Sequence, residues 1–216
     1  MIKPDYGVYL VTDQALCLGR DLLDVVGLAV QGGASIVQIR EKHSDTRDFV
    51  DLARRVKLLL GPQGVPLLIN DRVDVALAIG ADGVHVGQSD MHVADVRQLM
   101  GADAIVGLSV ENLDQVRAGN ALDVDYLGVG PVYATATKPD HSPPWGLDGL
   151  RSVRSISQHV LVAIGSVAVE NAYEIMETGV DGVAVVSAIC SAQSPAQAAR
   201  HLREVVARIR YKRNTF

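Results

Sequence analysis

The chain has 216 residues, of which 48% are hydrophobic and 4% aromatic, and its formal net charge is −5. Few aromatics predict a core of Val, Ile, Leu and Ala, as in parallel sheets, and the negative charge argues against general nucleic-acid binding. The two cysteines, Cys17 and Cys190, form no closely spaced metal-binding pair and favour a reduced, cytoplasmic protein. The first residues show no signal region, and no apolar stretch is long enough to cross a membrane.

Eight short apolar runs of β type follow one another along the chain. They are residues 7–12, 35–40, 66–70, 83–86, 104–108, 125–130, 160–164 and 182–186. The segments between them have helical periodicity, as in Leu22, Val25, Val26 and Ala29. This alternation predicts a single-domain (β/α)8 TIM barrel over residues 1–216, because a doubly wound sheet would carry an early G-x-G-x-x-G motif. The polar tail, residues 208–216, is expected to fray.

Polar side chains follow the carboxyl ends of these runs, the edge where barrel enzymes place their active sites. Gln38, Arg40 and Lys42 are spaced by two and therefore share one side of a strand. An inward-facing Gln38 needs a partner, which favours a functional role, whereas a solvated strand end explains Lys42 equally well. His85 stands within an apolar run, and we interpret it as a packed barrel histidine rather than a ligand.

Two carboxylates, Asp71 after Asn70 and Asp90, stand at the ends of the third and fourth runs. Taken singly, each is better explained as a cap of the following helix. As a pair on adjacent strand ends, facing a basic cluster, they are better explained by a shared divalent cation. Oxygen ligands without a Cys or His cluster favour Mg2+ over zinc.

Two further stretches are suited to anions. Thr135, Thr137 and Lys138 lie in a proline-bounded loop, although this loop alone is better explained as a solvated surface loop. Small residues and hydroxyls after the seventh and eighth runs, at 165–166 and 186–187, match the usual barrel phosphate site. Two anion sites, several basic groups and one metal indicate a reaction between two anionic partners.

In this order, the motifs resemble those of the thiamine phosphate synthase family. The resemblance covers nearly the whole chain and rests on Val11-Thr12-Asp13, residues 38–42, Asn70-Asp71-Arg72, the run G-V-H-V-G-Q-S-D ending at Asp90, Gly130-Pro131 with Thr135, Thr137 and Lys138, Gly165, and Val186-Ser187. It implies a TIM-barrel transferase of thiamine biosynthesis. Such an enzyme joins hydroxymethylpyrimidine diphosphate to thiazole phosphate and releases pyrophosphate.

The resemblance also implies a role for each matched residue. It assigns the pyrimidine diphosphate to Gln38, Arg40, Lys42, Asn70, Ser109 and Lys138, of which Arg40, Ser109 and Lys138 are catalytic. It assigns Mg2+ to Asp71 and Asp90, and the thiazole phosphate to Thr135, Thr137, Gly165, Val186 and Ser187. The implied partners are small-molecule substrates, with no nucleic acid or membrane, and a homo-oligomer is left open.

The chain departs from the family pattern at two places. Gly165-Ser166-Val167 stands where the family commonly has Gly-Gly-Ile, and Ser109-Val110-Glu111 stands where Ser-Thr-His is frequent. We predict that Ser166 has a negative φ and that its hydroxyl contacts the thiazole phosphate or a bridging water.

Three alternative functions stay open. They are a thiazole tautomerase-like relative on the same barrel, a Schiff-base aldolase using Lys138, and a non-catalytic sensor of phosphate ligands. The retained Asn70, Asp71, Asp90 and Lys138 argue against the first.

Overall fold

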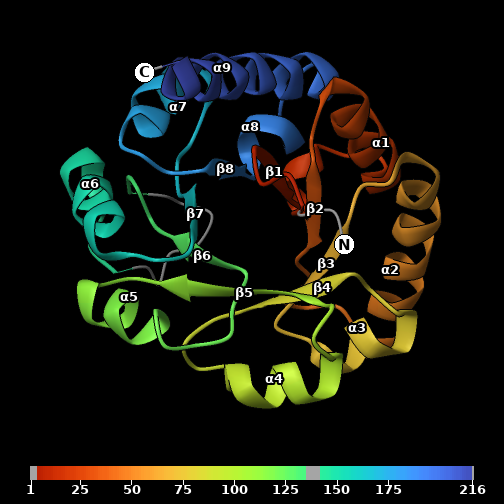
Figure 1. The fold of residues 1–216 in the computed structure, drawn as a ribbon. Helices are drawn as coiled ribbons and strands as arrows, with labels where there is room; N and C mark the ends of the chain where they lie inside the picture. Colours follow the sequence, from red (N-terminus) through yellow and green to blue (C-terminus); the bar gives the residue numbers. More distant parts are fainter. Residues whose placement is uncertain (1–3, 135–141, 216) are drawn as a thin grey trace.

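The structure, a computed structural model, describes residues 4–134 and 142–215. Eight parallel strands close into a barrel in chain order, with β1 paired to β8 (Figure 1). They are β1 (Val8–Val11), β2 (Ile36–Ile39), β3 (Leu67–Asn70), β4 (Gly83–Val86), β5 (Ile105–Val110), β6 (Tyr126–Val129), β7 (Val160–Ile164) and β8 (Gly182–Val185). The predicted (β/α)8 barrel is confirmed, and each predicted run overlaps a strand to within two residues at either end.

Helices surround the barrel and cover the outer face of the strands (Figure 1). They are α1 (Leu22–Gly32), α2 (Thr46–Leu60), α3 (Val73–Ile79), α4 (Val93–Met100), α5 (Leu113–Gly119), α6 (Gly146–Ile156), α7 (Val169–Glu177), α8 (Ser187–Cys190) and α9 (Pro195–Thr215), with short 3-10 turns at Ala15–Cys17 and Gly61–Gln63. The predicted apolar face of α1 is buried, as its period requires. Among the described helices, none combines the length and apolar character that a membrane span needs.

The interior of the barrel leaves room for two large polar rings. Gly107 on β5 faces the ring of Tyr126, and a Cβ at this glycine would lie 2.1 Å from the tyrosine Cζ. Gly128 on β6 faces His85 in the same way, with a Cβ to Cε1 distance of 2.9 Å. Such distances are too short for any side chain, so both strands need glycine for the rings to lie across the barrel.

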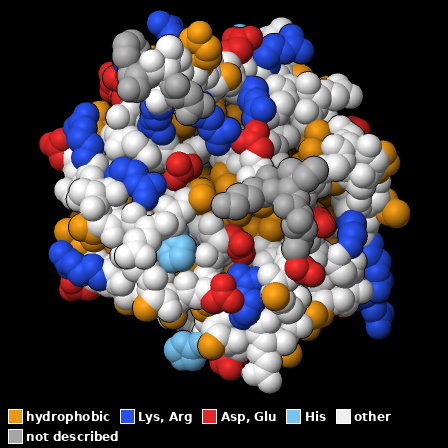
Figure 2. All heavy atoms as spheres, viewed as in Figure 1, with side chains coloured by type: hydrophobic (Ala, Val, Ile, Leu, Met, Phe, Trp, Pro, Cys, Tyr) orange, Lys and Arg blue, Asp and Glu red, His pale blue; other side chains and the backbone are white. Residues whose placement is uncertain are grey.

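The expectation that the C-terminal tail frays was wrong, because α9 continues to Thr215. Figure 2 shows basic side chains gathered over this helix. Arg210 donates to Asp5 and to the carbonyl of Asp181, each at 2.6 Å, and Arg213 donates to the carbonyl of Val180 at 2.9 Å. These arginines donate to backbone carbonyls just before β8. This tertiary contact keeps the end of α9 helical, although its polar sequence alone would not.

Candidate active site

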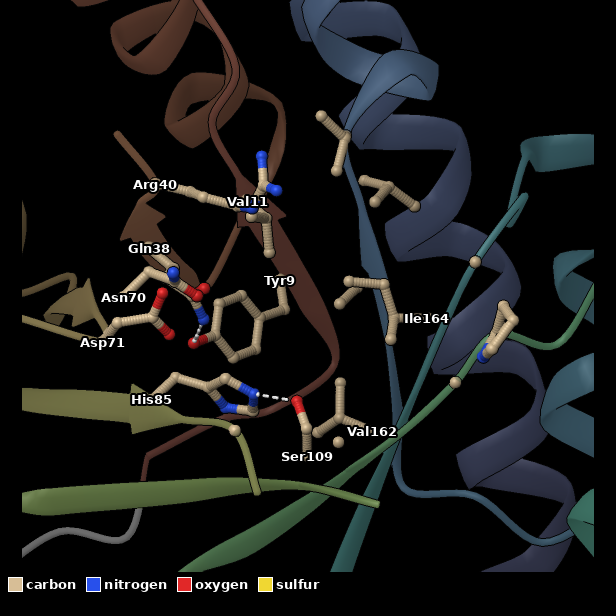
Figure 3. Close-up of a pocket in the computed structure, with 18 of the residues that line it drawn as sticks. Tyr9, Val11, Gln38, Arg40, Asn70, Asp71, His85, Ser109, Val162 and Ile164 are labelled. Atoms are coloured by element: carbon tan, nitrogen blue, oxygen red, sulfur yellow. Dashed lines mark hydrogen bonds between the residues drawn. The ribbon is translucent and has the colours of Figure 1, made fainter. Parts of the chain in front are cut away.

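A pocket of about 590 Å³ opens where the carboxyl ends of the strands meet (Figure 3). The predicted site residues that line it are Gln38, Arg40, Lys42, Asn70, Asp71, Asp90, Ser109, Gly165, Val186 and Ser187. The remaining predicted residues, Thr135, Thr137 and Lys138, lie outside the described residues. Closure of the barrel therefore brings together side chains that are up to about 150 positions apart in the chain.

One side of the pocket carries most of its charge. Arg40, which follows β2, has its guanidinium 4.0 Å from a carboxylate oxygen of Asp13, and its backbone N–H donates to the Thr12 hydroxyl at 3.2 Å. Lys42 forms an ion pair with Asp71 after β3. The Arg40 side chain is 25% exposed, so it is held near the rim but is still open to a ligand.

The two predicted metal ligands do not cap helices. Asp71 has a φ of +61°, and its backbone N–H donates to the His85 carbonyl at 2.8 Å. Helix α3 begins after Arg72, without a side-chain cap. Asp90 accepts from the backbone N–H of Gly87 at 2.7 Å, within its own loop. The capping explanation is thus wrong for both carboxylates.

The electrostatics of this pair fit a cation. Burial raises the pKa of Asp71, the Lys42 ammonium opposes that rise, and the neighbouring Asp90 carboxylate adds to it. A cation between the two carboxylates would favour the ionised form of Asp71 against both burial and its neighbour Asp90. Within the described part of the chain, no group of three or more His, Cys, Asp or Glu side chains is placed to hold a metal ion. Two carboxylates with water and phosphate oxygens match the way Mg2+ is usually bound.

A row of hydrogen-bonded polar side chains forms the floor of the pocket (Figure 3). Gln38 donates to the Tyr9 hydroxyl at 2.7 Å, and the hydroxyls of Tyr9 and Tyr126 are 2.8 Å apart. His85 contacts Tyr126 through Nδ1 at 2.7 Å and Ser109 through Nε2 at 2.8 Å. His85 is thus packed inside the barrel against Tyr126, as interpreted from the sequence, and it also lines the pocket.

Two pocket residues, Tyr9 and Tyr126, were not predicted from the sequence. Both stand in apolar strand segments, and in a parallel sheet such tyrosines are indistinguishable from core residues. The available signal was chemical, since a buried tyrosine hydroxyl usually needs a hydrogen-bond partner. Glu111, after β5, was noted only as a departure from the family pattern. It lines the pocket and accepts a hydrogen bond from Ser142 at 2.7 Å.

The opposite side of the pocket is formed by the loops after β7 and β8. Gly165 has a φ of +107°, and a Cβ there would lie 2.6 Å from Cα of Pro131, so only glycine allows this close approach. Ser166 has a φ of +52°, which corrects the prediction of a negative φ. Its hydroxyl donates to the Ala134 carbonyl at 2.6 Å, and this bond holds the residue in the left-handed region.

Three comparisons with known proteins agree with this geometry. A family model described as thiamine monophosphate synthase matches residues 8–189. A thiamine-phosphate synthase of Albidiferax ferrireducens is 55% identical over 92% of this chain and 91% of its own length. A thiamine-phosphate synthase of Syntrophomonas wolfei is 47% identical over 95% of this chain and 98% of its own length.

Solved structures give the same result. A thiamine phosphate pyrophosphorylase from Pyrococcus furiosus superimposes with a TM-score of 0.88 at 32% identity, covering 97% of this chain and 99% of its own. A 3-hexulose-6-phosphate synthase, with a TM-score of 0.67 at 17% identity over 93% of this chain and 99% of its own, shares the fold alone. The chain therefore belongs to the thiamine monophosphate synthase family and is a transferase of thiamine biosynthesis.

Proposed function

We propose that this chain joins hydroxymethylpyrimidine diphosphate to thiazole phosphate and releases pyrophosphate. The observation that carries the proposal is the polarity of one pocket. Arg40, Lys42 and the two carboxylates follow β2, β3 and β4, whereas the loops of Gly165 and Ser187 follow β7 and β8, so the two groups lie on different sides of the pocket. An uncharged hydrogen-bonded floor separates them, which suits a heteroaromatic ring between two anionic groups.

The charged side is suited to the diphosphate. Arg40 presents a planar donor that can bind two phosphate oxygens at once. Lys42 is held against Asp71, so it lies where the diphosphate would meet the carboxylate pair. We assign Mg2+ to Asp71 and Asp90, where its bound charge would neutralise the diphosphate and lower the energy of the departing pyrophosphate.

The reaction needs one bond to break and one to form. The C–O bond between the pyrimidine methylene and the diphosphate breaks, and its electron pair leaves with pyrophosphate. The lone pair of the thiazole nitrogen then forms the new C–N bond. Arg40 and Lys138 stabilise the growing negative charge, so that positioning and electrostatics lower the barrier without a protein nucleophile. Ser109 contributes a hydroxyl beside the ring.

The other side is suited to the thiazole phosphate. We assign this group to Gly165, Val186 and Ser187, with Thr135 and Thr137. The turn after β7 brings Gly165 against Pro131, so the loops after β6 and β7 meet at the rim. Backbone N–H groups of such loops bind phosphate without carrying charge. We also place the activity in the cytoplasm, since Cys17 and Cys190 are buried free thiols.

The test is to mix the two phosphorylated precursors with the protein and Mg2+, and to measure thiamine phosphate and pyrophosphate together. We expect both products in equal amounts, and neither when one precursor is omitted. Isomerisation of a thiazole precursor without the pyrimidine would favour the tautomerase alternative. Binding of both precursors without turnover would favour the sensor, and either result would overturn the proposal.

A further inference from the structure

The floor of the pocket is a continuous chain of hydrogen bonds with one member from each of five strands. Its order is Gln38 on β2, Tyr9 on β1, Tyr126 on β6, His85 on β4 and Ser109 on β5, and its four contacts measure 2.7, 2.8, 2.7 and 2.8 Å. Tyr9 and Tyr126 are each 1% exposed and Gln38 is 4% exposed. Bulk water therefore has almost no access to the middle of the chain, and its members must satisfy one another.

The direction of each bond follows from counting protons. Gln38 Nε2 donates to Tyr9, so the Tyr9 oxygen is an acceptor and its only proton passes to Tyr126. Tyr126 then donates its proton to Nδ1 of His85, which places the histidine proton on Nε2. Nε2 donates to the Ser109 oxygen, and the Ser109 proton points away from His85. Burial raises the pKa of both phenols, so both keep their protons.

The chain also has a reversed order that satisfies the same contacts. If Gln38 presents its carbonyl oxygen to Tyr9, then Tyr9 donates to Gln38 and Tyr126 donates to Tyr9. His85 then carries its proton on Nδ1, and Ser109 donates to Nε2. Each phenol has a single proton, so one bond cannot reverse alone without leaving a buried group unpaired. The two orders are therefore alternatives for the whole chain.

We propose that Tyr9, Tyr126 and His85 are positioning residues that couple the orientation of the Gln38 amide to the direction of the Ser109 hydroxyl. In the observed order, Gln38 keeps its carbonyl oxygen as an acceptor for the pocket, and Ser109 presents a donor. A ring ligand must then donate to Gln38 and accept from Ser109. This inference rests on the proposed function only for the identity of that ring. An aminopyrimidine has both an amino group that can donate to Gln38 and a ring nitrogen that can accept from Ser109.

The direct test is the tautomer of His85, measured by 15N-histidine NMR at a pH where the imidazole is neutral. We expect the proton on Nε2 in the wild-type protein. Gln38→Glu, once ionised, is an acceptor only, and we expect it to move the proton to Nδ1. Tyr9→Phe cuts the chain and should give a mixture of both tautomers. A wild-type Nδ1–H tautomer, or the same tautomer in all three proteins, would overturn the proposal.

Tyr6→Phe is the matched control. Tyr6 packs on Tyr126 with ring centroids 5.1 Å apart, and its hydroxyl is not part of the chain. Removal of this hydroxyl should leave the His85 tautomer unchanged. If Gln38→Glu does not fold, the comparison of Tyr9→Phe with Tyr6→Phe still tests the proposal. A change in packing alone would affect the His85 tautomer in both variants alike.

Turnover provides a second measurement. Tyr9→Phe should lower kcat/KM for the pyrimidine diphosphate about tenfold, with little change in KM for the thiazole phosphate. Tyr6→Phe should lower neither, and an equal loss in both variants would overturn the coupling. The proposed function and the proposed coupling can be disproved independently of each other. If the tautomers follow the chain but no thiamine phosphate forms, only the proposed function is wrong.

Discussion

Ser166 donates its hydroxyl to the carbonyl of Ala134 at 2.6 Å while its own backbone has a φ of +52°. On the far side of residues 135–141, Ser142 donates to Glu111 at 2.7 Å. The two positions at which this chain departs from its family pattern thus contact the residues that border this segment. Ser166 and Glu111 are therefore residues that hold the rim of the pocket, and the bond from the Ser166 hydroxyl to Ala134 explains why a strained serine is tolerated.

Two substitutions separate the strain at Ser166 from its hydrogen bond. Ser166→Ala keeps a Cβ, and therefore keeps the strain of a left-handed residue, but it loses the hydroxyl. Ser166→Gly loses both the strain and the hydroxyl. We expect the alanine variant to be less stable than the glycine variant by about 1 kcal/mol. Urea denaturation of both variants and the wild type measures the difference. An alanine variant as stable as the glycine variant would show that Ser166 carries no strain.

The carboxylate pair predicts a dependence on divalent metal. Asp71→Asn should raise the Mg2+ concentration needed for half-maximal turnover, because it removes one of two negative ligands. Asparagine tolerates the φ of +61° at this position, so the barrel should stay folded. Asp74→Asn, on the exposed surface of α3, is the matched control and should leave the Mg2+ requirement unchanged. Full turnover in excess chelator would contradict the metal assignment.

Lys138 is predicted to act on the leaving group rather than as a covalent amine. Lys138→Ala should lower kcat by about 100-fold to 1,000-fold, the usual effect of losing one donor to a developing charge. Binding of thiazole phosphate, measured by calorimetry, should change far less. Lys212→Ala, at an exposed ion pair with Glu177 on the surface, serves as the control. A substrate linked to Lys138 by borohydride would support the aldolase alternative instead.

The lowered pKa of Asp5 predicts how the stability of the fold depends on pH. Burial alone would raise the pKa of this carboxyl, but hydrogen bonds from Arg203, Arg210 and the Gly7 N–H outweigh it and lower the pKa to about 2. Because the pKa is lower in the folded state, the ionised carboxylate stabilises the fold at every pH above its ordinary pKa of 3.8. This contribution is lost as the pH falls from about 4 to about 2.

Asp5→Asn should therefore lower the free energy of unfolding at pH 6 by about 1 kcal/mol, a figure reduced for solvent screening of a side chain that is 35% exposed. The difference from the wild type should disappear near pH 2. Denaturation at a series of pH values measures it. A difference that stays constant with pH would mean that Asp5 acts through packing and not through its charge.

The sequence alone was enough for the barrel and for the polar residues at the strand ends that line its pocket. The physical reason is that both follow from local rules. Strands buried on both faces are continuous apolar runs, and the polar residues that follow them share one edge of a parallel barrel. Gln38, Asp71 and Ser187 could thus be assigned to one site from their positions at strand ends.

Only the tertiary structure decided which groups meet in space. Tyr9 and Tyr126 are separated by 117 positions, and their hydroxyls meet because both rings lie inside the closed barrel, where Gly107 on the neighbouring strand leaves room for Tyr126. The φ of Ser166 depends on the carbonyl of Ala134, which belongs to another loop. The last turns of α9 depend on carbonyls before β8. Each of these features is stabilised by a partner distant in sequence, so no local pattern could have predicted it.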